Sequence, residues 1–173
     1  THGDTHYWGV WWGKEPFDSF NTTISSFMSE YGFQSFPEYA SFKKYASKED
    51  RNMYSEVMNS HQRSSIGNAT IADYMKRNYR DPIGFEELLY MSQLLQADGV
   101  QAGIEAHRRN KDKCMGSLYW QLNDCWPVAS WSGIDYYGKW KALHYTVKDV
   151  FENYLISCEE KNDGAITTVV TGG

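Results

Sequence analysis

The stretch DPIGFEELLYMSQLLQADGVQAGIEAHRRN, residues 81–110, decides the fold class of this chain. Asp81 followed by Pro82 is typical of a helix start, because the first turn of a helix does not need the N–H that proline lacks. Gly99 and Gly103 weaken the helix only modestly. The apolar residues that follow Pro82 predict one long helix with a single apolar stripe, formed by Phe85, Leu88, Leu89, Met91, Leu95 and Ile104.

Short apolar segments on both sides of this helix predict strands. Residues 26–32 and 114–122 are rich in aromatic and small side chains, as are residues 5–11 near the start. A further amphipathic helix is expected at about 139–154, and the segment 47–50 has the spacing of a capping box that opens a helix. Strand, helices, strand, helix is the order of an α/β protein with parallel strands. Three strands are too few for a barrel, so the pattern predicts an α/β fold.

The composition indicates a globular chain and argues against several partners. The chain has 173 residues, of which 41% are hydrophobic, and its net charge of -5 argues against nucleic acid and anionic membranes. No apolar run is long enough to span a bilayer. The segment 1–5 has neither an initiator Met nor a signal-peptide core, which indicates a piece of a longer polypeptide. Cys114, Cys125 and Cys158 lack metal-ligand spacing, so we expect neither a disulfide framework nor a metal.

All seven tryptophans lie outside residues 13–119, so the helical middle of the chain has none. Most of them therefore fall at predicted strand ends and loops. In a parallel α/β fold the carboxyl ends of the strands form the ligand face, where broad aromatic rings suit the C–H faces of a sugar. Core packing under long loops is the alternative for any single tryptophan.

The segment FMSEYGFQSFP, residues 27–37, places a carboxylate inside a predicted strand. Period-two alternation sends Met28, Glu30 and Gly32 to one face, where the glycine leaves space beside the acid. A strand carboxylate without a nearby Lys or Arg in the sequence is exposed to solvent, paired across space, or functional. The pattern by itself leaves these three readings open.

Three motifs resemble the β-mannosidases of glycoside hydrolase family 2. They are GDTHYWGVWWG (3–13), FMSEYGFQSFP (27–37) and GSLYWQLNDCWPVASWSGIDYYGKWKALHY (116–145), and the resemblance runs from about residue 3 to about 155. It implies that residues 1–155 form the C-terminal part of a catalytic (β/α)8 TIM barrel, about strands six to eight with their helices, and that this α/β fold is incomplete by itself. Residues 156–173 would then begin a following β-rich segment or linker.

The activity that this resemblance implies is that of a retaining exo-β-mannosidase, which releases terminal non-reducing β-D-mannose. The nucleophile of the family lies in the Ser-Glu-Tyr-Gly motif, here at Glu30, and attacks the anomeric carbon while a second carboxylic acid protonates the leaving oxygen. The implied partners are a β-mannoside or manno-oligosaccharide substrate and the remainder of the same polypeptide. We expect no cofactor, no nucleic acid and no membrane partner.

The resemblance also implies substrate-binding residues. Trp120 matches the aromatic floor of the sugar subsite at the end of strand eight, and His6, Tyr7 and Trp8 match the end of strand six. Alternation places His6 and Trp8 on one side and Tyr7 on the other, so we favour Trp8 and then His6 as substrate contacts. Residues after Trp120 are expected to cap loops or to wall the pocket: Asn123, Asp124, Trp126, Trp131, Tyr136 and Tyr137.

The second catalytic acid is absent from the motifs. In the family it is a Glu that directly follows an Asn, and no Asn-Glu pair occurs in the 173 residues. We therefore predict that this segment carries half of the catalytic pair and cannot hydrolyse a mannoside alone. The alternatives are a β-galactosidase or β-glucuronidase of the same family, or a non-catalytic carbohydrate-binding segment.

Overall fold

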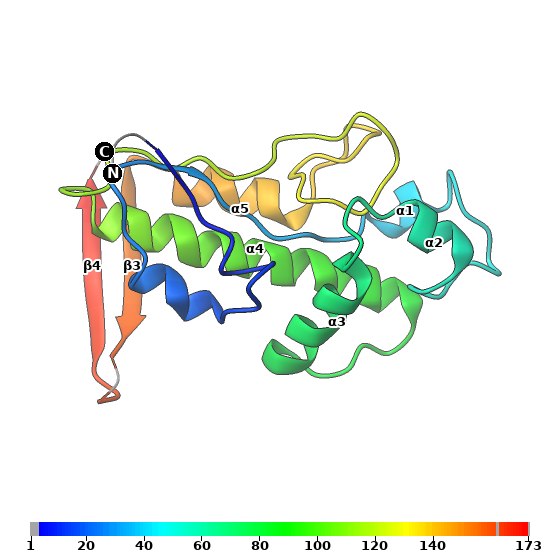
Figure 1. The fold of residues 1–173 in the computed structure, drawn as a ribbon, viewed down its shortest axis with the longest axis horizontal. Coiled ribbons are helices and arrows are strands. Elements are labelled where there is room, and N and C mark those ends of the chain that lie inside the picture. The colour runs from blue at the N-terminus through cyan, green and yellow to red at the C-terminus, as the bar shows by residue number, and fades with distance from the viewer. Residues whose placement is uncertain (1–3, 162, 173) are drawn as a thin grey trace.

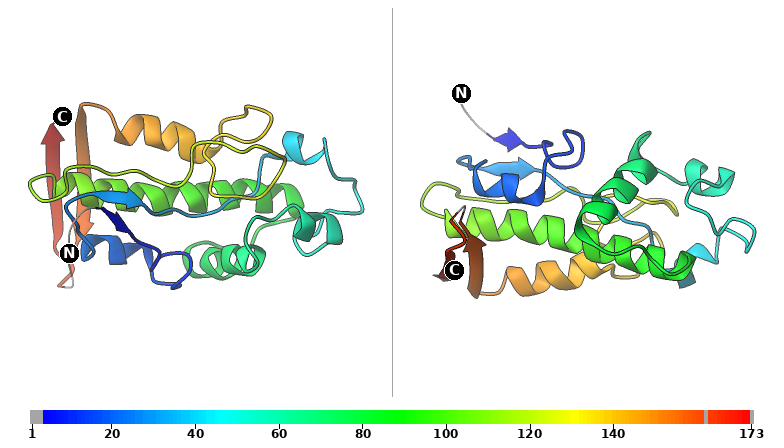
Figure 2. Two further views of the ribbon diagram at one scale, coloured as in Figure 1. Left: turned by 45° about the horizontal axis from the view of Figure 1, so that its top comes forward. Right: turned by 90° about the horizontal axis from the view of Figure 1, so that it is seen from below.

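One long helix, α4, organises the computed structural model, which describes residues 4–161 and 163–172. Gly3, the first residue of the first motif, lies outside the described residues. Figures 1 and 2 show α5 along one side of α4, η1 along the other, and a β-hairpin across its C-terminal end. The elements are β1 (Thr5–His6), η1 (Phe17–Asn21), β2 (Met28–Glu30), α1 (Tyr39–Phe42), α2 (Glu56–Ser60), α3 (Gly67–Asn78), α4 (Phe85–Arg109), α5 (Ala142–Val150), β3 (Tyr154–Glu160) and β4 (Ile166–Gly172).

The predicted long helix is confirmed, but it begins later than the Asp-Pro pair. Gly84 has a φ of 87°, a left-handed conformation that favours glycine, and α4 starts at the next residue. Glu86 and Glu87 lie in the first turn and basic side chains lie in the last, which complements the helix dipole at both ends. None of the helices in the described residues is both long and apolar enough to cross a bilayer.

The two glycines inside α4 have a packing role. A Cβ at Gly99 would lie 2.7 Å from the ring of Phe17, and one at Gly103 would lie 2.8 Å from the ring of Tyr31. Two elements, η1 and the end of β2, therefore approach the helix more closely than any larger residue would allow. The modest cost in helix propensity is offset by this contact.

The first two strands are parallel neighbours, and β2 carries an irregularity at its end. Thr5 pairs with Met28 and His6 with Glu30, so one residue of β1 is matched by two of β2. The backbone shows the same shift, since Thr5 N–H donates to Phe27 O and Tyr7 N–H donates to Glu30 O. A bulge of this kind turns a side chain away from strict alternation.

The third predicted strand, 114–122, is wrong as a regular strand. It runs beside β2 in the parallel direction through a single bridge between Met28 and Ser117. The ladder then slips, because Trp120 N–H donates to Tyr31 O at 2.7 Å while Glu30 O already accepts from Tyr7. The bulge in β2 thus prevents the regular pairing that the sequence predicts, although three parallel segments do lie side by side.

Two other local predictions are corrected. The strand expected at 5–11 ends at His6, because the chain folds back on itself where Gly13 N–H donates to Trp8 O at 3.0 Å. The capping-box spacing at Ser47 produces the side-chain contact without a helix: Asp50 accepts from the Ser47 amide at 2.9 Å. The next helix, α2, starts only at Glu56, where the Ser55 hydroxyl caps it.

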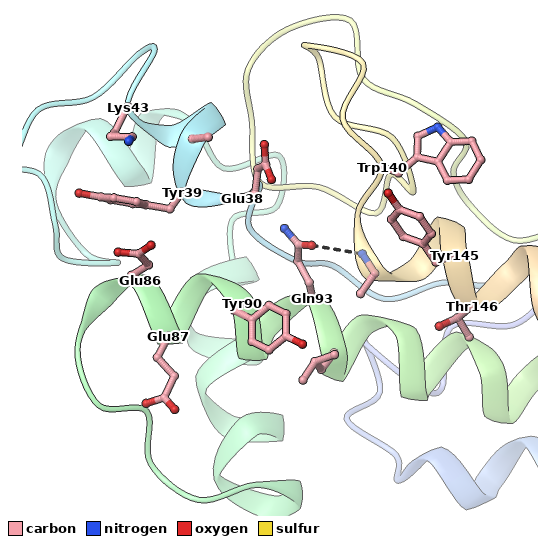
Figure 3. A pocket seen from close by; sticks show the side chains of 13 residues that line it. Glu38, Tyr39, Lys43, Glu86, Glu87, Tyr90, Gln93, Trp140, Tyr145 and Thr146 are labelled. Carbon is pink, nitrogen blue, oxygen red and sulfur yellow. Dashed lines mark hydrogen bonds between the residues drawn. The ribbon is translucent and has the colours of Figure 1, made fainter.

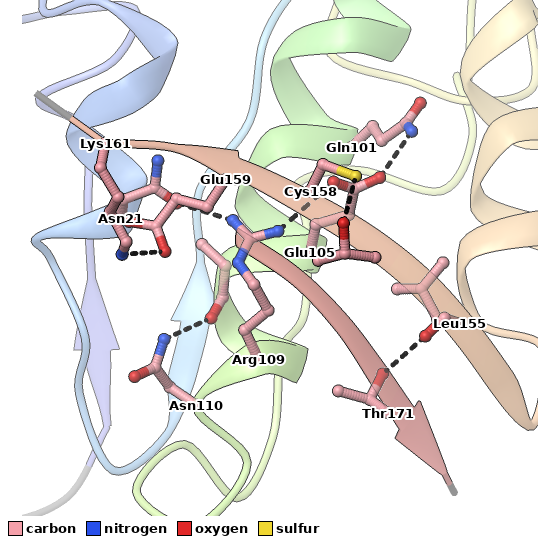
Figure 4. A network of polar contacts seen from close by, with 12 residues as sticks. Asn21, Gln101, Glu105, Arg109, Asn110, Leu155, Cys158, Glu159, Lys161 and Thr171 are labelled. Atoms are coloured by element: carbon pink, nitrogen blue, oxygen red, sulfur yellow. Dashed lines mark hydrogen bonds and ion pairs between the residues drawn. The ribbon is translucent and has the colours of Figure 1, made fainter. Parts of the chain in front are cut away.

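The C-terminal end of the chain forms an antiparallel hairpin of β3 and β4, preceded by α5, which is shorter than the predicted 139–154. Figure 4 shows the region where this hairpin, η1 and the end of α4 meet. The guanidinium of Arg109 donates to Asn21 at 2.7 Å, and Lys111 donates to the Gly172 carbonyl at 2.6 Å. The chain thus changes from helix to strand at Tyr154, where β3 begins. The domain boundary expected near residue 155 stays a prediction.

Candidate active site

The carboxylate of Glu30 lies at the irregular end of β2, with 26% of its side chain exposed. Its Oε1 accepts a hydrogen bond of 2.8 Å from the indole Nε1 of Trp8, and the Nδ1 of His6 lies 3.6 Å from the same oxygen. His6 ends β1, and Trp8 lies in the loop that follows it. The parallel pairing of the first two strands therefore brings together three residues that are up to 24 positions apart in the sequence.

A second polar contact holds His6 from the other side. Its Nε2 lies 3.5 Å from the carboxylate of Asp4, which also accepts from the Ser29 hydroxyl at 2.7 Å. This hydroxyl is the largest cause that lowers the pKa of Asp4 below its ordinary value. Because of the bulge, Ser29 and Glu30 both belong to this cluster, whereas Met28 is fully buried. The predicted alternation of Met28 and Glu30 on one face is therefore wrong.

Gly32 lets the backbone of Trp120 lie close to the segment that follows Glu30. A Cβ at Gly32 would lie 2.3 Å from the carbonyl oxygen of Trp120 and 3.4 Å from the ring of Trp131. Strand alternation predicts open space beside this glycine, but the backbone of the next parallel segment fills it. The peptide bond between Trp120 and Gln121 is cis, and the Trp120 ring is 45% exposed. The geometry thus places an exposed indole on the segment next to the carboxylate.

Trp131 joins the indoles around this site. Its ring centroid lies 6.0 Å from that of Trp8, 5.8 Å from that of Trp11 and 6.4 Å from that of Trp12. Trp11 is fully buried, whereas 47% of Trp12 is exposed. Four of the seven tryptophans therefore form one cluster beside Glu30, in which buried rings support exposed ones.

Tyr7 points away from the carboxylate, as alternation predicts. Its hydroxyl donates to Glu15 at 2.5 Å, and its ring packs edge-on against Phe20 of η1 at 5.4 Å. Burial is the largest cause that raises the pKa of this phenol. Tyr7 is therefore a support of the loop after β1, and the structure does not bring it to Glu30.

The residues after Trp120 form a buried polar network. Asp124 accepts from the hydroxyls of Ser130 at 2.7 Å and Ser132 at 2.6 Å. Lys141, which is 1% exposed, has its Nζ 3.4 Å from the carbonyl oxygens of Ser35 and Ser130. Burial lowers the pKa of Lys141 to about 8, against the opposing effect of nearby carboxylates. The network fixes the loop that carries Trp131.

The other predicted wall residues lie away from Glu30 or have local roles. Asn123 donates at 3.5 Å to the Asp124 carbonyl, so it belongs to the loop. Trp126 packs on His61 at 5.3 Å. The rings of Tyr136 and Tyr137 lie edge-on to each other at 5.1 Å. No group of three His, Cys, Asp or Glu side chains in residues 4–161 and 163–172 is placed to hold a metal ion.

Comparison with known proteins gives consistent matches to one kind of enzyme. Beta-mannosidase B of Aspergillus niger is 34% identical over 173 residues, which covers 96% of this chain and 20% of that protein. The crystal structure of Beta-D-Mannosidase from Dictyoglomus thermophilum matches with a TM-score of 0.94 and 34% identity, over 98% of this chain and 21% of that one. The chain is homologous to one segment of the β-mannosidases. The resemblance inferred from the three motifs is thereby confirmed.

The remaining comparisons define the limits of this homology. Beta-mannosidase B of Aspergillus terreus is 33% identical, again over 96% of this chain and 20% of that protein. The chain spans about a fifth of the length of the β-mannosidases that it matches. An exo-chitosanase of Amycolatopsis orientalis shares the fold, with a TM-score of 0.71 at 19% identity over 88% of this chain and 20% of that one. No protein-family model matches the chain.

Sequence reasoning missed Asp4, and it named Trp131 as a wall residue without its place among the other indoles. Asp4 lies two positions before His6, and the alternation that pairs His6 with Trp8 extends to it, so this signal could have found it. The position of Trp131 between three other indoles had no local signal. Only the path of the loop that Asp124 and Lys141 hold brings this ring to β1.

Proposed function

We propose that the polypeptide containing this chain is a retaining exo-β-mannosidase of glycoside hydrolase family 2, with Glu30 as its nucleophile. The carboxylate of Glu30, held by the Trp8 indole at 2.8 Å beside the exposed Trp120, carries the proposal. A partly exposed carboxylate next to aromatic platforms matches the needs of covalent sugar chemistry. Homology with the β-mannosidases supports mannose as the sugar.

In the proposed reaction, Glu30 attacks the anomeric carbon while the glycosidic C–O bond breaks. A second carboxylic acid, supplied from outside these 173 residues and about 5 Å away, protonates the departing oxygen. Water then attacks the covalent glycosyl-enzyme, gives its proton to that second group, and restores Glu30 with retention of configuration. The N–H of Trp8 keeps one carboxylate oxygen fixed, and the Trp120 ring provides the floor on which the sugar rests.

The fold supports a place for this chain as strands six to eight of a (β/α)8 barrel. The three parallel segments β1, β2 and 114–122 follow one another in the order such a barrel requires, and α4 connects the last two. Alternate residues Leu118, Trp120 and Leu122 are 54%, 45% and 57% exposed. Such an apolar row is what further strands of a barrel would face.

The test of the nucleophile uses the intact polypeptide and the substitution Glu30→Ala. Hydrolysis of p-nitrophenyl β-mannoside is expected to fall at least about 10⁴-fold, since the covalent step is lost. Added azide should restore turnover of an activated aryl mannoside and yield the α-mannosyl azide. Glu56→Gln, at an exposed position of α2, is the matched control. Unchanged turnover of Glu30→Ala with retained sugar binding would favour the non-catalytic carbohydrate-binding segment.

The sugar is tested separately from the mechanism. The intact polypeptide should hydrolyse p-nitrophenyl β-mannoside faster than the corresponding galactoside, glucuronide or glucosaminide. A preference for one of the other sugars would keep Glu30 as nucleophile and replace mannose. The isolated 173-residue segment should show no turnover, because the second acid is outside it; activity of the purified segment would contradict this division of the catalytic pair.

A further inference from the structure

A cavity lies apart from Glu30, which is not among the residues that line it. It has a volume of about 1020 Å³ and lies where α1, α4 and the start of α5 meet. Figure 3 shows Tyr90 on α4 facing this space from one side and Tyr145 with Trp140 from another, with Gln93 between them. Ligand-binding pockets have volumes of ~300–1,000 Å³, so the cavity can hold more than one hexose ring.

Aromatic rings with free faces form two walls of this cavity. Tyr90 is 60% exposed, Tyr145 is 57% exposed and Trp140 is 44% exposed. Tyr145 and Trp140 pack edge-on at 5.1 Å, so they support each other without covering their outer faces. Large exposed rings gathered around one hollow are unusual on a protein surface and mark binding sites. Their flat faces suit the C–H faces of a sugar ring.

The floor of the cavity is fixed. Gln93 is 6% exposed, its amide donates to the Phe36 carbonyl at 3.3 Å, and its oxygen accepts from the Ala142 amide at 3.2 Å. One side chain of α4 thus ties together the segment after β2 and the start of α5. The cavity is therefore formed before any ligand binds, which lowers the entropic cost of binding.

Charge around the cavity disfavours anionic ligands, and its carboxylates can accept hydrogen bonds from hydroxyls. Glu38, Glu86 and Glu87 line it with one cation, Lys43. Glu87 is already bonded to Arg80. The excess of carboxylates repels phosphate and other anions, whereas carboxylates accept hydrogen bonds from sugar hydroxyls.

We propose that this cavity is a second saccharide-binding site, which takes a neutral manno-oligosaccharide independently of Glu30. Ring faces for stacking, carboxylates for hydroxyls and a rigid floor are combined in one hollow. The choice of mannose among neutral sugars rests on the proposed function. The site itself rests on the geometry of the cavity.

The test separates the two sites in the intact polypeptide. The Glu30→Gln variant, which should bind without turnover, is titrated with β-1,4-mannotriose by calorimetry, and two sites per chain are expected. Adding Tyr90→Ala or Tyr145→Ala should weaken the second site about tenfold or more and leave the first unchanged. Both single variants should keep kcat/KM for p-nitrophenyl β-mannoside within about twofold, since neither ring lies near Glu30. Tyr154→Ala, at a 79% exposed tyrosine of β3, is the matched control.

Four results would overturn the proposal or one part of it. One is a single mannotriose site that the Tyr90 and Tyr145 variants do not change. Another is binding of pentalysine, and not of the trisaccharide, in the cavity. This result would indicate a cationic peptide ligand. Equal binding of cellotriose would overturn mannose and retain a saccharide site. If Glu30→Gln is fully active and Tyr90→Ala still loses a bound trisaccharide, the proposed nucleophile fails and the second site stands.

Discussion

Substitution of Gly32 by alanine should separate Trp120 from Glu30. The added methyl group would lie 2.3 Å from the Trp120 carbonyl oxygen, where an ordinary contact needs 3.4 Å. A backbone carbonyl cannot rotate away like a flexible side chain, so the 114–122 segment must move by about 1.1 Å. This movement stretches the hydrogen bond from Trp120 N–H to Tyr31 O, which is 2.7 Å long.

The size of the effect follows from that displacement. Overpacking of this kind costs about 1–3 kcal/mol of stability. A misplacement of about 1 Å in a catalytic arrangement costs on the order of 10²-fold in rate. In the intact polypeptide, Gly32→Ala is therefore expected to lower kcat/KM for p-nitrophenyl β-mannoside about 100-fold, with a lower urea midpoint.

A second glycine provides the control. A Cβ at Gly172 in β4 would lie 3.6 Å from the Tyr154 ring, an ordinary contact. Gly172→Ala should change neither the urea midpoint nor kcat/KM by a measurable amount. Wild-type stability and activity in Gly32→Ala would refute the close approach of the two segments. A lower urea midpoint of Gly32→Ala with wild-type kcat/KM would show that the close contact between Gly32 and Trp120 does not position Trp120 for activity.

Three other perturbations test separate contacts. Trp8→Phe removes the indole N–H that donates to Glu30. Because a hydrogen bond to a charged group is worth about 1.5–3 kcal/mol, kcat/KM should fall about 10- to 150-fold. A smaller loss would show that this hydrogen bond does not contribute to activity. Burial lowers the pKa of Lys141 to about 8, so between pH 8 and about 10.5 the unfolded chain binds more protons than the folded chain. The free energy of unfolding in urea should therefore rise with pH in this window, relative to that of the Lys141→Met variant. A difference between the two proteins that does not change with pH would contradict this prediction. Burial also lowers the pKa of His107 to about 4, so its imidazole NMR signals should not titrate between pH 5 and 8. A titration midpoint near pH 6.5 would show that the ring is not buried.

The long helix could be read from the sequence because its signal is local and repeated. Apolar side chains at helical spacing need only one partner surface, and α4 buries them against several elements. The start of α4 was placed too early, since the left-handed conformation of Gly84 depends on the turn that precedes the helix. The helix α3, residues 67–78, has no comparably long stripe, and its buried Tyr74 packs against Phe17 and Phe33 from distant segments.

Several residues around Glu30 were named from the sequence, but their geometry was not. Motif resemblance pointed to Glu30 and Trp120, and alternation correctly separated Tyr7 from His6 and Trp8. Alternation failed at Glu30 itself. The bulge in β2 arises from pairing with two neighbouring segments at once, and no pattern within residues 26–32 records it.

The amino-acid sequence alone determined the kind of protein, because helix periodicity and the three motifs are properties of short stretches of chain. Tertiary structure alone decided which side chains touch Glu30, how closely Trp120 approaches through Gly32, and where the cavity beside Tyr90 lies. The physical reason is that each of these features joins segments dozens of residues apart. Their contacts depend on a register and on a close packing distance that neither partner segment specifies by itself.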